Sequence, residues 1–135
     1  MLTMDEVKLA IMNALENVDL EKLDIIAFDA CLMGMIEIAT DLKDVAYVML
    51  ASEQTEPGEG WPYHYILKEV VKYPNLSPKM LAKLIVKKYY EYYVYQMNES
   101  DITYSAIDLS LIIVSELEIN LILSSFTLLK YILSE

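Results

Sequence analysis

Two short apolar runs, separated by a segment with helical spacing, constrain the fold of this chain most. The runs cover residues 23–28 and 45–51 and are rich in aliphatic side chains, as strands buried on both faces of a parallel sheet are. Residues 33–42 between them carry apolar side chains at helical spacing. Strand, helix and strand in this order predict a βαβ unit with two parallel strands and a right-handed crossover.

Helix signals precede and follow this unit. Thr3 can cap a helix over residues 4–17, with Glu6 completing a capping box. After a loop at residues 52–60, Pro62 suits the first turn of a helix that runs to about residue 72. The chain therefore places helices on both sides of the predicted strands in sequence, as α/β folds do.

The second half of the chain continues the same pattern. Ser77 and Pro78 mark the start of a longer helix that ends near residue 96. Residues 102–107 are predicted to form a third strand. Asp108 can then cap a final helix that runs almost to residue 135.

Composition and charge limit the partners. The 135 residues fit one domain or a large piece of one, and 56% hydrophobic residues indicate a packed fold. A net charge of −11 makes nucleic acid an improbable partner. The longest uncharged stretch, residues 119–129, is too short for a membrane span, so none is expected.

The only cysteine, Cys31, follows the first predicted strand directly. Ligands bind at the carboxyl ends of strands in open α/β sheets, and a nearby helix N-terminus stabilises the thiolate. Cys31 is therefore a candidate nucleophile. Free cysteines are also among the most buried residue types and commonly serve only packing, so its position alone leaves both interpretations open.

Asp29 lies two residues before Cys31, on the same side if the strand geometry continues. A carboxylate beside a thiol opposes thiolate formation unless a cation neutralises it. Asp29 therefore either awaits a basic substrate side chain or caps the following helix. Glu53, Glu56 and Glu59 in the next loop would extend it into an acidic rim around Cys31, although surface glutamates often serve only solubility.

Four segments resemble the clostripain-like cysteine peptidases. Residues 28–37 (Phe-Asp-Ala-Cys-Leu-Met-Gly-Met-Ile-Glu) resemble that family's nucleophile segment, and residues 51–63 resemble its next hallmark at the expected distance. Residues 2–7 and 105–110 also fit. The resemblance implies a caspase-like three-layer α/β/α sandwich with a mainly parallel sheet. It further implies a Cys–His dyad and endopeptidase activity after arginine or lysine, without a cofactor or metal.

The resemblance also implies roles for individual residues. Cys31 takes the place of the nucleophile, and its backbone N–H would be one oxyanion donor. Asp29 matches the acidic residue at the floor of the pocket for the basic side chain. The loop would wall that pocket, with the substrate-binding candidates Ser52, Glu53, Thr55 and Glu59.

One element of the family pattern is missing. The family's base is a histidine in a His-Gly pair on a preceding strand, and this sequence has no such pair. Its sole histidine, His64, follows the loop and does not match the base position. We therefore expect residues 1–135 to be part of one catalytic domain, inactive alone. Its expected partners are peptides or proteins with arginine or lysine at the cleavage site, and either the upstream polypeptide or a second copy.

Two other hypotheses are consistent with the residues. The chain can be a non-catalytic interaction module that keeps the peptidase fold without its base. It can also be part of a different thiol hydrolase on a doubly wound sheet, whose base comes from elsewhere.

Overall fold

The computed structural model describes residues 3–113. The helices are α1 (Met4–Asn17), α2 (Ile36–Leu42), α3 (Tyr63–Lys72) and α4 (Pro78–Tyr95), and the strands are β1 (Leu23–Ala27), β2 (Ala46–Ala51) and β3 (Ser105–Asp108). One 3-10 turn, Leu109–Leu111, follows β3. The final helix predicted to follow Asp108 begins only as this turn, since Ile112 is extended, and the rest of its predicted range lies outside the described residues.

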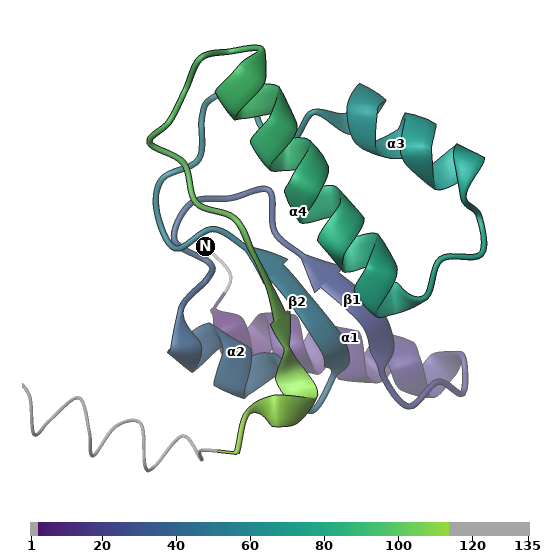
Figure 1. Ribbon diagram of the computed structural model, residues 1–135. Coiled ribbons are helices and arrows are strands. Elements are labelled where there is room, and N and C mark those ends of the chain that lie inside the picture. Colours follow the sequence, from purple (N-terminus) through teal and green to yellow (C-terminus); the bar gives the residue numbers. More distant parts are fainter. Residues whose placement is uncertain (1–2, 114–135) are drawn as a thin grey trace, which may run out of the picture.

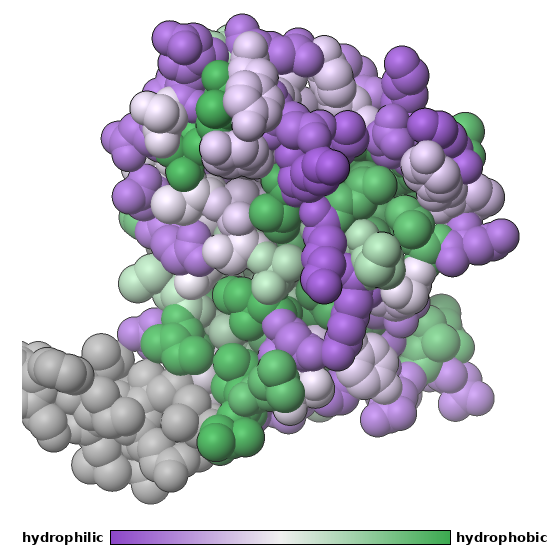
Figure 2. Space-filling model, in the orientation of Figure 1, coloured by the Kyte–Doolittle hydropathy of each residue, from purple (hydrophilic) through white to green (hydrophobic). Residues whose placement is uncertain are grey.

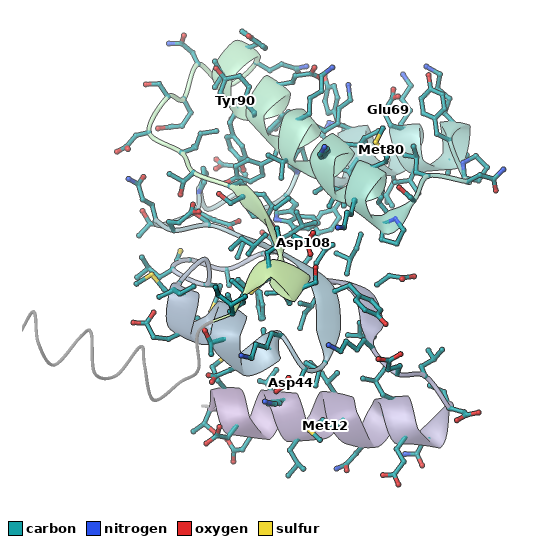
Figure 3. All side chains as sticks on the ribbon, turned by 60° about the horizontal axis from the view of Figure 1, so that its bottom comes forward. Met12, Asp44, Glu69, Met80, Tyr90 and Asp108 are labelled. Atoms are coloured by element: carbon teal, nitrogen blue, oxygen red, sulfur yellow. The ribbon has the colours of Figure 1, made fainter. Side chains whose placement is uncertain are left out.

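The strands form one sheet in the order β1–β2–β3. β1 and β2 are parallel, with Ile25 opposite Val48, whereas β3 runs antiparallel to β2. Helices α1 and α2 cover one face and α3 and α4 the other (Figure 1). The side chains show the same layers, with Met12 on the α1 side and Met80 and Tyr90 on the α4 side (Figure 3). The described residues therefore form a three-layer α/β/α arrangement around a mixed sheet.

Both faces of the central strand β2 are buried, as predicted for residues 45–51. Because successive side chains of a strand point to opposite faces, Met49 and Ala51 enter one core while Val48 and Leu50 enter the other. The core beneath α1 and α2 contains Leu15, Ala39, Leu42, Val45, Ala46, Met49, Ala51 and Leu109. The core beneath α3 and α4 contains Val48, Leu50, Ile66, Ala82 and Ile85.

The helix-start signals are largely confirmed. The Thr3 hydroxyl accepts from the Glu6 amide at 3.3 Å, while the Glu6 carboxylate accepts from the Thr3 amide at 2.7 Å. This is the predicted capping box, and α1 has the predicted bounds. Ser77 precedes α4 as predicted, but its side chain makes no capping hydrogen bond.

Two predictions about β1 and α2 are wrong. β1 is only half-buried, with Asp24 and Ala27 exposed, because it lies at the edge of the described sheet. Helix α2 begins at Ile36 instead of residue 33. The amides of Leu32 and Gly34 donate to the carbonyls of Gln54 and Ser52, which keeps this segment out of the helix.

The third strand starts later than predicted, at Ser105. Asp108 does cap the turn after it, since its carboxylate accepts from the Ser110 amide at 3.2 Å. In residues 3–113 we find no helix long and apolar enough to cross a membrane.

Apolar side chains also reach the surface. Figure 2 shows hydrophobic residues among hydrophilic ones on the face that it presents. On α1, Leu9 and Met12 are exposed, and after β3 the exposed fraction of Leu111 is 72% and that of Ile113 is 91%.

Candidate active site

Two loops lie side by side where the parallel strands β1 and β2 end. One covers residues 28–35 and the other residues 52–62. The Leu32 amide donates to the Gln54 carbonyl at 2.9 Å, and the Gly34 amide donates to the Ser52 carbonyl at 2.7 Å. The turn between the two hydrogen bonds takes Leu32 into the left-handed region, at φ 59°. These hydrogen bonds bring the segment of Cys31 against the second loop.

Cys31 is exposed and lies just beyond the end of β1. Its sulfur accepts a hydrogen bond from the Glu56 amide at 3.2 Å. Because α2 begins only at Ile36, the expected stabilisation of a thiolate by that helix N-terminus is wrong. The Glu56 amide supplies a donor to the sulfur instead.

Asp29 faces the entrance to α3 and does not cap the helix that follows it. Its carboxylate accepts from the Tyr63 hydroxyl at 2.9 Å and from the Trp61 amide at 3.3 Å. Gly60 adopts φ +66°, and a Cβ there would come within 3.0 Å of both Asp29 oxygens. A glycine is therefore required where the second loop passes Asp29. The hydrogen bond to Asp29 raises the pKa of Tyr63.

Glu56 is the largest departure from the acidic rim expected from the sequence. Both of its carboxylate oxygens are buried, and no donor among the described residues forms a hydrogen bond of good geometry with them. Burial, followed by the neighbouring Asp29 charge, raises the pKa of Glu56 to about 7. The local sequence gives no signal for this, because glutamates in a Gly-Pro loop are ordinarily solvated.

The other loop candidates do not converge on Cys31. Ser52 is fully buried, and its hydroxyl lies 2.9 Å from that of Thr103, so its contacts hold the loop. The Glu53 carboxylate accepts from the Ser105 hydroxyl at 2.6 Å on the β3 side. Thr55 and Glu59 are exposed. The structure thus brings together Asp29, Cys31 and Glu56, together with Tyr63.

Three tyrosines behind the loops were not among the sequence candidates. The Tyr104 hydroxyl donates to the Phe28 carbonyl at 2.9 Å, and the Tyr93 hydroxyl donates to the Gly60 carbonyl. Tyr89 stacks on Tyr104 with ring centroids 4.6 Å apart. Burial first, and then nearby carboxylates, raise the pKa of all three and that of Tyr93 to about 12, so the hydroxyls stay protonated. Those of Tyr93 and Tyr104 act as donors, whereas the buried Tyr89 hydroxyl has no hydrogen-bond partner among the described residues. The spacing of Tyr89 and Tyr93, four residues apart on α4, was the available signal.

His64 lies on α3 and is exposed. Its ring contacts the rings of Tyr65 and Tyr92, with centroid distances of 4.5 and 5.7 Å. Its neighbour Tyr63 is the residue that turns toward Asp29. Because consecutive residues of a helix point about 100° apart, His64 is directed away from the site that Tyr63 faces.

The fold is a three-layer α/β/α arrangement with an exposed cysteine after a parallel strand, and comparison with known proteins identifies its family. The chain belongs to the clostripain family, whose model matches residues 2–130. A comparison with curated proteins gives no significant match.

Solved structures of similar fold come from the same class. A clostripain from Bacteroides thetaiotaomicron in complex with the peptide inhibitor BTN-VLTK-AOMK is 25% identical, with a TM-score of 0.66. A B. fragilis cysteine protease is 23% identical, with a TM-score of 0.65. The alignments cover 83% and 82% of this chain but only 45% of either relative. The caspase-like fold class is therefore confirmed for a chain that spans less than half their length.

An inactive zymogen C11 protease from Parabacteroides distasonis has a similar fold, at 22% identity and a TM-score of 0.56. The alignment covers 76% of this chain and 27% of the zymogen.

We expect Gly34→Ala to destabilise the protein by about 1–3 kcal/mol, because a Cβ there would meet backbone atoms of Ser52 and Glu53 at 2.9 Å. Gly58→Ala is the matched control, since its Cβ would have nothing within 4 Å. Urea unfolding followed by circular dichroism measures both. If the two variants are equally stable, the loop of residues 28–35 can move away from the loop of residues 52–62 at Gly34 without loss of stability.

Proposed function

We propose that this chain provides the nucleophile-bearing part of a cysteine endopeptidase that cleaves after arginine or lysine. The observation that carries the proposal is the juxtaposition of an exposed thiol and an exposed carboxylate at one end of the sheet. The Cys31 sulfur is held by the Glu56 amide, and Asp29 is held by Tyr63 and Trp61. One group can attack a peptide carbonyl while the other pairs with the preceding side chain.

The proposed reaction is acyl transfer to Cys31. The thiolate attacks the carbonyl carbon, and the Cys31 amide is placed as one donor to the developing oxyanion. The thiol proton passes to a base and then to the leaving amine, and water releases the acyl group. His64 faces Tyr65 and Tyr92, so the proposed base is a histidine from polypeptide outside this chain.

We propose that this polypeptide adds a strand to the sheet at the outer edge of β1. β1 ends the sheet, and in residues 3–113 its far edge pairs with no strand. An added strand there would lie next to the one that leads to Cys31, which brings its carboxyl-end residues to the same end of the sheet if it is parallel. Residues 1–135 would then be part of one catalytic domain.

Charge supports the basic specificity. Asp29 is exposed, Glu59 lies in the adjoining loop, and the net charge of the chain is −11. Such a field attracts cationic substrates. The relative bound to BTN-VLTK-AOMK adds support, because the inhibitor's peptide has lysine next to the AOMK group.

A non-catalytic interaction module is the second candidate. It is favoured by the position of His64, the sole histidine, against tyrosine rings. Covalent labelling distinguishes the two candidates. An active-site nucleophile beside a pocket for a basic side chain reacts selectively with a peptidyl ketone that carries such a side chain, whereas an interaction module does not.

We expect a lysyl acyloxymethyl ketone to label Cys31 much faster than its leucyl counterpart when the histidine-bearing polypeptide is present. Mass spectrometry of the single cysteine measures the rate, with Cys31→Ala as the control that remains unlabelled. Equal rates with the two ketones would argue against a basic-side-chain pocket. If neither ketone labels Cys31, the interaction module is favoured.

A further inference from the structure

Glu56 occupies an unusual position in this site, because its two parts face different partners. Its backbone amide donates to the Cys31 sulfur at 3.2 Å. Its side chain turns inward, with both carboxylate oxygens buried and next to Asp29. The residue that holds the thiol is therefore also the neighbour of the proposed specificity carboxylate.

The donors around the two carboxyls are distributed unequally. One oxygen of Asp29, Oδ2, accepts from both the Tyr63 hydroxyl and the Trp61 amide. Glu56 has no donor of good geometry among the described residues. An ionised carboxylate only accepts hydrogen bonds, so Asp29 cannot satisfy Glu56 unless a proton lies between them.

We propose that Asp29 and Glu56 share one proton in the empty site, held mainly by Glu56, and that a cationic substrate side chain displaces it. This inference rests on the proposed function, since it takes Asp29 to be the group that meets that cation. It adds a positioning residue for the reaction, because Glu56 acts on Cys31 and Asp29 and not on the scissile bond.

The surroundings of Glu56 favour the neutral form. Burial is the largest cause of its raised pKa of about 7, the Asp29 charge is next, and the backbone of Ala30 acts weakly in the opposite direction. No cation contributes to that shift. Within residues 3–113, the titratable groups that interact with it are Asp29, Cys31, Tyr63, Tyr89, Tyr93 and Tyr104.

The direction of the linkage follows from charge. A bound cation favours the ionised form of Glu56 and lowers its pKa, so binding releases a proton wherever the empty site still holds one. Affinity for the cation therefore rises as the pH increases toward 7 and becomes constant above it. Below that pH range Glu56 is protonated, so the two carboxyls together carry one negative charge. Above it Glu56 is ionised, and both carboxylates can interact with the substrate cation.

Carbon-13 NMR of the side-chain carboxyls in the 135-residue chain tests the proposal directly. Glu56→Gln removes one resonance and so assigns it. We expect that resonance to titrate near neutral pH in the native chain, and at lower pH in Asp29→Asn, although burial keeps it above an ordinary glutamate. Benzamidine, which mimics the arginine side chain, should also lower the pH at which the Glu56 resonance titrates. Asp44→Asn is the control, because Asp44 pairs with Lys8 beside α1 (Figure 3).

The possible outcomes separate the two proposals. Titration of Glu56 near 4.5, or a titration that Asp29→Asn leaves unchanged, would overturn the shared proton whatever the substrate is. Benzamidine that binds without moving the Glu56 titration would overturn the displacement and leave the basic specificity intact. Benzamidine that fails to bind while Asp29→Asn still shifts Glu56 would overturn the basic specificity and, with it, the displacement step.

Discussion

Replacing Asp29 with asparagine should lower kcat/KM for arginyl and lysyl substrates by about 10²-fold to 4 × 10³-fold in the completed enzyme. Removing one partner of a charge pair that substrate binding buries typically costs about 3–5 kcal/mol, and about 1.4 kcal/mol corresponds to a factor of ten. The substitution keeps the shape of the side chain, so the contacts with Tyr63 and Trp61 are disturbed little. Turnover of matched arginyl, lysyl and leucyl amides measures the effect.

Glu56 is unsuitable as the control for this experiment, because its carboxyl lies against Asp29. Asp44→Asn is the better control, since this exposed carboxylate precedes β2 whereas the site follows the strands. A loss confined to basic substrates supports the assignment of Asp29. An equal loss for all three amides would instead mean that Asp29 has a general structural role at the entrance to α3.

The second large effect concerns the chain on its own. We expect no appreciable turnover of an arginyl amide by the purified 135 residues, because a base must come within about 3 Å of the thiol or act through one water. His64, the sole histidine, packs against Tyr65 and Tyr92. Adding the histidine-bearing polypeptide should produce turnover that Cys31→Ala abolishes.

His64→Ala provides the decisive comparison. It should leave the turnover of the completed enzyme essentially unchanged, since the ring is exposed on α3. Robust turnover by the isolated chain that His64→Ala eliminates would falsify the prediction and make His64 the base.

The fold was predictable where local signals and burial agree. Thr3 and Glu6 define the start of α1 by a capping box that needs only neighbouring residues. β2 was predictable because a central strand is apolar on both faces. The bounds of α3 and α4 also follow from local proline and serine signals to within a residue.

The parts that sequence reasoning missed depend on contacts between distant segments. The start of α2 is set by hydrogen bonds from residues 32 and 34 to the second loop, which no local pattern reveals. The position of Cys31 and Asp29 after β1 was accessible from the sequence, because an apolar run ends just before them. The burial of Glu56 was not, since it requires the loop after β1, helix α4 and the segment before β3 to be assembled around it.

The hydrogen bond from Tyr104 to the Phe28 carbonyl joins residues 76 positions apart in the sequence. Contacts of such long separation carry a large loop-closure entropy and tend to form late in folding. The segment that orients the thiol is therefore expected to become ordered only after β3 has docked beside β2. A nascent or partly unfolded chain would then lack the ordered arrangement of the segment that follows β1.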